Sequence, residues 1–306
     1  MGATARAAIR ALRALGPKKI VFAVPVAVVE AAEMLSAEAD ELVAVLVPEQ
    51  LLAIGAWYSD FEQVDDREVA AWLARAAQPA EKEREMERAV KVVAGEVFLG
   101  GNLVVPRDAT GLVLFAHGSG SSRFSPRNRY VASALQAVGL ATLLMDLLTD
   151  EEEEIDAETA ELRFDIAFLA DRVAQATDWL LREPSLAHLR IGYFGSSTGA
   201  AAALVAAAAR PEAVAAVVSR GGRPDLAARA LPYVCAPTLL IVGGEDREVL
   251  ALNREALQEL GCEKQLEVVR GATHLFEEPG TLEQVAERAG VWFAHHLAAR
   301  EETARI

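Results

Sequence analysis

Apolar and polar positions follow two patterns along the first part of the chain. One is the three-to-four-residue spacing of an amphipathic helix, as in residues 4–15, which Gly16 and Pro17 follow in the manner of a helix end. The other is a continuous apolar run with β-branched residues, which predicts a strand covered on both faces. In order, we expect a helix over 4–15, a strand over 20–27, a helix over 28–39, a strand over 41–47, an aromatic-rich loop at 57–61 and a helix over 66–77.

A charged run at residues 79–88 separates this segment from a second, longer pattern. Residues 92–105 predict a hairpin that turns around Gly100, Gly101 and Asn102. Short apolar runs then alternate with amphipathic stretches. The expected strands cover 112–116, 141–145, 189–194, 213–219, 238–242 and 265–269, and the expected helices cover 126–137, 164–181, 198–210, 225–230, 249–260 and 282–298.

This alternation predicts the α/β class, a mainly parallel sheet with helices on both faces. We expect two parts, a small α/β segment over residues 1–80 and a larger domain over residues 91–300. An acidic stretch at residues 150–161 follows one expected strand, where loops often line binding sites. Its charges nevertheless favour a solvated loop or the start of a helix.

Composition and charge narrow the range of functions. The chain has 306 residues, of which 52% are apolar, and this is enough for a well-packed core. A formal net charge of −15 disfavours nucleic acids and anionic membranes as partners, because both require a basic surface. Cys235 and Cys262 stand in no close-spaced metal or redox motif, so we expect two free thiols in a reducing compartment and no bound metal.

Targeting signals are not recognisable in the sequence. No apolar run is long enough to span a bilayer, and residues 1–16 lack the central apolar run of a secretory signal. Arg6 does not fit the myristoylation pattern. We therefore expect a cytoplasmic protein that binds neither membrane nor nucleic acid, while the sequence leaves open whether it forms a homo-oligomer.

The strongest chemical motif is Gly195-Ser196-Ser197-Thr198-Gly199. It follows an expected strand and opens an alanine-rich helix, which is the context that a G-x-S-x-G nucleophile elbow requires. Flanking glycines let strand and helix approach, so that Ser197 projects from the edge of the sheet. The Thr198 N–H at the helix N-terminus then faces developing negative charge. A structural turn of the same composition is the competing interpretation.

Ser197 needs an imidazole as base and a carboxylate to orient it, in the chain order serine, acid, histidine. Asp246 follows the strand expected at 238–242, and His274 follows the one expected at 265–269. Both therefore fall at the sheet edge that carries Ser197. The competitors for the acid are Glu245 and, less favourably, Asp225; those for the base are His188, His295 and His296, which fit surface or packing positions better.

A second oxyanion donor is expected from a loop after an earlier strand. His117-Gly118-Ser119-Gly120 follows the strand expected at 112–116, and its glycines let the backbone bend close to the nucleophile. The sequence therefore predicts an oxyanion hole from the N–H groups of Ser119 and Thr198. His117 is expected to hold this loop rather than to act as a second base.

Residues 91–297 resemble the dienelactone hydrolase-related branch of the α/β-hydrolases. The similarity lies in four motifs, at residues 117–128, 195–199, 243–246 and 271–276. It implies an α/β-hydrolase fold, a Ser197–Asp246–His274 triad, no metal or organic cofactor, and cleavage of carboxylic esters. Dienelactone hydrolases proper carry cysteine as the nucleophile, so Ser197 favours a general short-acyl esterase over an enzyme for dienelactone.

The first 80 residues or so resemble the C-terminal part of a type I phosphoribosyltransferase domain. Matching stretches are residues 3–8, 22–27 and 57–61. That family binds diphosphate through an acidic pair and a glycine/threonine loop just before the first helix, and Met1-Gly2-Ala3-Thr4 stands where such a loop would end. We expect a truncated remnant without transferase activity, retained as a packing partner, a lid or a dimer surface.

Together these observations predict a serine hydrolase that cleaves short-acyl carboxylic esters through an acyl-enzyme, with a small-molecule ester as its partner. The same triad also serves thioesterases, amidases and acyltransferases, and the sequence does not separate them. A non-catalytic assembly protein on a hydrolase scaffold is the alternative from another class.

Overall fold

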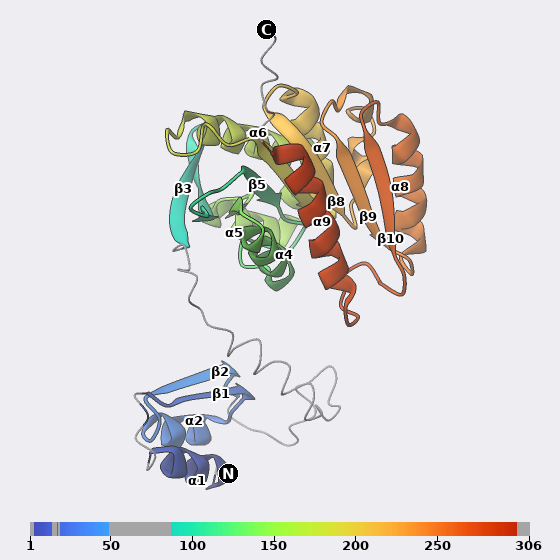
Figure 1. The fold of residues 1–306 in the computed structure, drawn as a ribbon. Helices are drawn as coiled ribbons and strands as arrows, with labels where there is room; N and C mark the ends of the chain where they lie inside the picture. Colours follow the sequence, from blue (N-terminus) through green and yellow to red (C-terminus); the bar gives the residue numbers. More distant parts are fainter. Residues whose placement is uncertain (1–2, 14–16, 18, 49–86, 299–306) are drawn as a thin grey trace. The chain divides into compact units, whose positions relative to one another are not determined.

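The computed structural model describes residues 3–13, 17, 19–48 and 87–298. The chain divides into two compact units, Met1–Ala80 and Glu81–Ile306 (Figure 1). The aromatic loop predicted at residues 57–61 and the helix predicted at 66–77 lie outside the described residues. No helix of the described ranges is long and apolar enough to cross a membrane.

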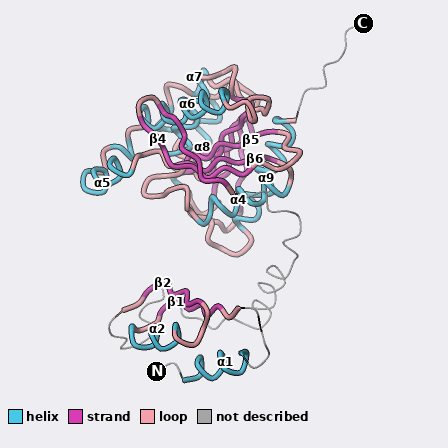
Figure 2. The backbone as a smooth tube through the Cα atoms, turned by 90° about the vertical axis from the view of Figure 1, so that its left-hand side faces the viewer, coloured by secondary structure: helices cyan, strands magenta, loops and turns pink. Residues whose placement is uncertain are grey.

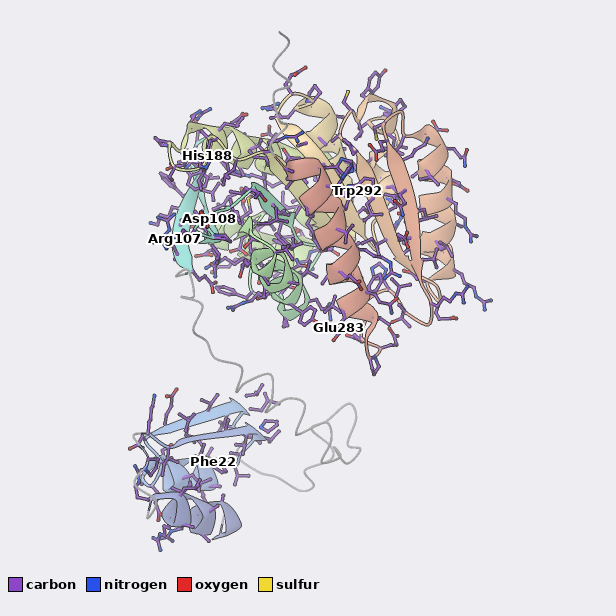
Figure 3. The ribbon with its side chains drawn as sticks, viewed as in Figure 1. Phe22, Arg107, Asp108, His188, Glu283 and Trp292 are labelled. Carbon is purple, nitrogen blue, oxygen red and sulfur yellow. The ribbon has the colours of Figure 1, made fainter. Side chains whose placement is uncertain are left out.

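The N-terminal unit contains α1 (Ala3–Arg13), β1 (Val21–Val26), α2 (Val29–Ser36) and β2 (Glu41–Leu46). The two strands are parallel, and both helices lie on the same side of them (Figures 1 and 2). Ile9, Ile20 and Leu35 form its small core, with Phe22 packed against them beneath the strands (Figure 3). This agrees with the helix–strand–helix–strand order predicted from the pattern.

One expectation for this unit was wrong. The apolar runs predicted strands covered on both faces, but exposed and half-buried positions alternate along β1 and β2. Val21, Val43 and Val45 are exposed, because α1 and α2 cover only the opposite face.

The larger unit is built on an eight-stranded sheet in the order β10-β9-β8-β7-β5-β6-β4-β3. Strands β5 to β10 are parallel, and β4 joins antiparallel to β3 and β6. The strands are β3 (Arg88–Ala94), β4 (Val97–Val104), β5 (Gly111–Ala116), β6 (Leu140–Met145), β7 (Ile191–Ser196), β8 (Val214–Arg220), β9 (Thr238–Gly243) and β10 (Lys264–Val269). The predicted α/β-hydrolase fold class is thereby confirmed.

Helices cover both faces of this sheet. They are α4 (Pro126–Ala137), α5 (Asp150–Thr159), α6 (Ile166–Arg182), α7 (Thr198–Ala209), α8 (Arg247–Glu259) and α9 (Thr281–Leu297). One core cluster joins α6 and α7 to the sheet, and another joins α4 and α9 to its opposite face (Figure 2). The central strands β5, β6 and β7 are buried at every position, as their uninterrupted apolar runs predict.

The hairpin turns at a different place from the one predicted. Its turn is at Gly95, which has a φ of +63° and stands between β3 and β4, whereas Gly100 and Gly101 lie inside β4. These two glycines serve close packing instead, because a Cβ on Gly100 would lie 2.4 Å from Arg123 Nη1. The turn predicted from a glycine pair was therefore a site of close approach.

Two further segments depart from the predicted elements. The helix predicted over 225–230 is reduced to a single 3-10 turn, Pro224–Ala227. The acidic stretch forms α5, whose first turn is closed by a capping box between Thr149 and Glu152. Four acidic residues in that turn suit the positive end of the helix dipole, which explains why this charged segment is helical.

Candidate active site

Ser197 stands on a strained turn between β7 and α7. Its φ of +52° and ψ of −120° are values that residues other than glycine rarely adopt. Glycines on both sides permit a close approach of strand and helix. A Cβ on Gly195 would lie 2.4 Å from Ala200 Cα, and one on Gly199 would lie 2.2 Å from His117 O. The turn places Ser197 at the carboxyl edge of the sheet.

Gly199→Ala is therefore expected to lower the free energy of unfolding by about 3 kcal/mol, because the new methyl group meets backbone atoms that cannot rotate away. Gly290→Ala in α9 is the matched control: its Cβ would meet only Leu135 Cδ2, at 3.8 Å, and alanine favours a helix. Urea unfolding of both variants measures the difference. Equal midpoints for the two would contradict this account of the elbow.

Backbone hydrogen bonds fix the turn to the neighbouring strand. The Ser197 N–H donates to Arg220 O at 3.3 Å, and the Arg223 N–H donates to Ser197 O at 3.2 Å. Arg220 and Ser196 are register partners of β8 and β7. The residue after Arg220 is Gly221, whose φ is +52°. The end of β8 thus forms one wall beside the serine.

The structure brings the predicted base and acid together. His274 Nδ1 lies 2.6 Å from Asp246 Oδ2, and 14% of the Asp246 side chain is exposed against 38% of the His274 side chain. An Nδ1–H that donates to the carboxylate leaves Nε2 free to accept a proton. Of the competing acids, Asp225 is paired with Arg223 at 2.7 Å, and Glu245 is exposed.

Close backbone packing supports this pair. A Cβ on Gly243, at the end of β9, would lie 2.4 Å from Ala272 O, so the loops that carry Asp246 and His274 lie against each other. The Glu245 N–H donates to Ala272 O at 3.0 Å. The three histidines that competed for the base are not part of this pair: His188 precedes β7, at the end of the unit opposite to Glu283 (Figure 3), and His295 and His296 lie in the last turn of α9.

His274 and Ser197 both lie next to the end of β8, at Arg220 and Gly221. A Cβ on Gly221 would lie 3.6 Å from the His274 ring, and the Ser197 N–H donates a hydrogen bond to the carbonyl oxygen of Arg220. Within the described residues the Ser197 hydroxyl has no hydrogen-bond partner, so the serine–imidazole bond is not formed in this arrangement. Such bonds are often long in enzymes without substrate and tighten when it binds.

The two predicted oxyanion residues also meet, but in an unexpected way. The Ser119 N–H donates to Thr198 Oγ1 at 2.9 Å, so this amide is occupied by a side chain. The Thr198 N–H is one of the first amides of α7, which have no acceptor within the helix. A Cβ on Gly118 would lie 3.1 Å from Ser197 Cβ, which shows how closely the loop passes the serine.

His117 fixes this loop through both ring nitrogens. Its Nε2 accepts from the Leu147 N–H at 3.1 Å, which leaves the proton on Nδ1 to donate to Gly118 O at 3.0 Å. Burial lowers the pKa of His117, so the ring is neutral at pH 7. The loop is tied at its other end by Asp146, which accepts from the Arg123 backbone N–H at 2.8 Å and from its guanidinium.

A pocket of about 310 Å³ opens next to Thr198, the residue that follows Ser197; Ser197, Asp246 and His274 are not among the residues that line it. Its walls come from the 117–122 loop, the segment after β6, helix α5 and the start of α6: His117, Gly118, Ser119, Gly120, Ser121, Ser122, Leu147, Leu148, Glu153, Asp156, Arg163, Leu169 and Thr198. Asp156 is buried and paired with Arg163 at 2.5 Å. The acidic stretch thus forms a helix, as its charges favoured, and two of its residues, Glu153 and Asp156, also border the pocket.

Arg220 is a charged group at the site that sequence reasoning missed. Its side chain is 8% exposed, and its Nη1 has no hydrogen-bond partner among the described residues. Burial, and to a smaller extent the charge of Arg127, lowers its pKa to about 10. Nothing in the sequence distinguished this arginine, because its burial arises from tertiary packing around the end of β8, which α9 contacts.

Over residues 3–13, 19–48 and 87–298, no three His, Cys, Asp or Glu side chains are grouped so that they could hold a metal ion.

The parallel sheet, the strained serine turn after β7 and the His–Asp pair after β9 and β10 define an α/β-hydrolase. The chain belongs to the dienelactone hydrolase family, whose family model matches residues 101–298. It is accordingly a hydrolase.

Known proteins support this assignment. A crystal structure of dienelactone hydrolase from Anabaena variabilis is 64% identical, with a TM-score of 0.69, and covers 70% of this chain and 99% of its own. Est1E from Butyrivibrio proteoclasticus shares the fold at 14% identity, with a TM-score of 0.58, over 68% of this chain and 98% of its own.

A relative from Mycobacterium tuberculosis matches nearly the whole chain. It is 51% identical over 309 residues, which cover 97% of this chain and 68% of the relative, and it carries the provisional name phosphoribosyl transferase. The match therefore includes the N-terminal unit, in agreement with the resemblance of that unit to phosphoribosyltransferases.

Proposed function

We propose that this protein is a serine esterase that cleaves short-acyl carboxylic esters, with Ser197 as nucleophile, His274 as base and Asp246 as the group that orients the imidazole. The observation that carries the proposal is the 2.6 Å contact between His274 Nδ1 and Asp246 Oδ2, at the sheet edge where the strained turn presents Ser197. A serine hydroxyl requires such a base to become a nucleophile.

The reaction follows from these positions. His274 Nε2 takes the proton of Ser197 Oγ while Oγ attacks the ester carbonyl. The carbonyl oxygen becomes an oxyanion, which the Thr198 N–H at the start of α7 stabilises. His274 then gives its proton to the leaving alcohol. Water attacks the acyl-enzyme in the same way and releases the acid.

Hydrolysis of p-nitrophenyl acetate and butyrate tests the proposal directly, together with labelling by a fluorophosphonate probe. We expect turnover and one label per chain on Ser197. Matched thioesters and anilides with the same acyl group extend the test to thioesterase and amidase activity. Turnover of a thioester or an anilide without turnover of any ester would refute the esterase proposal.

The pocket next to Thr198 is proposed to hold the acyl group. Leu148 lines it and is 8% exposed, so Leu148→Trp is expected to fill part of the 310 Å³. We expect kcat/KM for hexanoate relative to acetate to fall about tenfold, since small volume changes in apolar pockets give discrimination of this order. Leu181→Trp, at a residue that is 42% exposed on α6 and does not line the pocket, is the control. An unchanged ratio in Leu148→Trp would rule out this role for the pocket.

A further inference from the structure

The Thr198 side chain lies at the start of α7, directly after the proposed nucleophile, and borders the pocket there. Thr198 is 4% exposed. Its Oγ1 accepts the Ser119 N–H at 2.9 Å. The loop amide that would ordinarily point at the oxyanion is therefore directed at this hydroxyl.

A threonine hydroxyl that accepts one hydrogen bond still has a proton to donate. Among the described residues, no acceptor takes the Thr198 proton. Acceptance from an amide also polarises the hydroxyl and makes it a better donor. The Thr198 hydroxyl, polarised by the Ser119 N–H, can thus donate a hydrogen bond to a substrate oxygen in the pocket.

Hydrogen bonds and close packing fix the position of the loop over residues 117–122. Gly118 passes Ser197 so closely that a Cβ on it would lie 3.1 Å from both Ser197 Cβ and Ser196 O. His117 and Asp146 hold the two ends of the loop, through Leu147 N–H and Arg123 respectively. To free the Ser119 N–H for a substrate, the enzyme would have to break its hydrogen bond to Thr198, which is partly buried, and this costs free energy.

We propose that the Thr198 hydroxyl is a catalytic oxyanion donor, acting beside the Thr198 N–H and in the place that the sequence assigned to the Ser119 N–H. The proposal rests on the esterase function proposed above. In the first step, Ser197 Oγ bonds to the carbonyl carbon, the carbonyl π electrons move to oxygen, and the Thr198 O–H and N–H both donate to that oxyanion. Both donors come from one residue, so the helix start fixes their spacing.

Thr198→Val removes the hydroxyl and keeps the branched shape. We expect the acylation rate constant and kcat to fall about 100-fold, the usual effect of losing one oxyanion donor, while KM changes less than threefold. Thr198→Ser is expected to recover most of the rate. The measurements are stopped-flow release of p-nitrophenol and steady-state kinetics on a short ester.

Two results for the Thr198 variants would contradict the proposal. If Thr198 merely occupies the Ser119 N–H, removal of the hydroxyl frees that amide, and Thr198→Val keeps or raises kcat. A loss that Thr198→Ser fails to recover would assign Thr198 a packing role. Either outcome overturns the proposal. If the valine variant does not fold, the pair Thr198→Ala and Thr198→Ser, which differ by the hydroxyl alone, gives the same comparison.

Two controls distinguish a failure of the Thr198 proposal from a failure of the proposed esterase function. Thr238→Val removes a buried hydroxyl that donates to Ala236 O at 2.9 Å, at the opposite end of the sheet, and should leave kcat within twofold of the parent. Fluorophosphonate labelling of Thr198→Val should still reach one label per chain, only more slowly. Absence of labelling in the parent protein would instead refute the esterase function itself.

Discussion

Ser197→Ala is expected to lower kcat for short p-nitrophenyl esters by about 10⁵-fold or more, because no other group can form the acyl-enzyme. The variant should also lose all fluorophosphonate labelling. Its thermal midpoint should stay near that of the parent. Alanine has about the same conformational cost as serine at a φ of +52°, and the backbone hydrogen bonds of the elbow do not involve the serine hydroxyl.

The neighbouring serine provides a matched control. Ser196 is the last residue of β7 and is 3% exposed, so Ser196→Ala removes a hydroxyl one residue away without touching the strained position. It should keep kcat within about threefold of the parent. If turnover and labelling survive Ser197→Ala but disappear with Ser196→Ala, the nucleophile is Ser196 and the role proposed for Ser197 is wrong.

Asp246→Asn is expected to lower kcat by about 10⁴-fold, which is the loss known for the equivalent change in serine proteases. The amide side chain keeps the shape of the carboxylate but can donate to His274 Nδ1, and this leaves the proton on Nε2. Nε2 then cannot accept the serine proton. KM for a neutral short ester should change little, because Asp246 does not line the pocket.

The two other acids that the sequence offered serve as controls. Glu245→Gln changes an exposed side chain next to Asp246, and Asp225→Asn breaks only the 2.7 Å pair with Arg223. Both variants should retain most of the parent kcat under the same assay. A 10⁴-fold loss in Glu245→Gln, with Asp246→Asn active, would contradict the orienting role of Asp246.

Much of the fold could be predicted from local pattern. The central strands of the larger unit carry uninterrupted apolar runs, and five of the six α-helices found in residues 87–298 lie within a few residues of their predicted bounds. The wrong predictions arose where tertiary contacts decide between two structures that fit the same local pattern. Gly100 and Gly101 look like a turn, but they lie in β4 because Arg123 and Val90 pack against them. A glycine pair fits both situations, and only the neighbours distinguish them.

The candidate site was predictable in its parts. The elbow around Ser197 depends on glycines adjacent in sequence, and Asp246 and His274 were located by the strands that precede them. The walls of the pocket were not predictable, because Leu148, Arg163 and Leu169 belong to three separate segments. Their meeting depends on how α5 and α6 pack, which no single stretch of sequence encodes.

The sequence by itself determined the alternation of strands and helices, the strained serine turn and the order of serine, acid and histidine, since each depends on near neighbours or on position after a strand. Tertiary structure decided which acid meets His274, across 28 residues, and that the Ser119 amide bonds to Thr198, across 79 residues. The reason is that a hydrogen bond depends on the position of both partners to within a fraction of an ångström. Only the packed sheet and its loops fix positions to that degree.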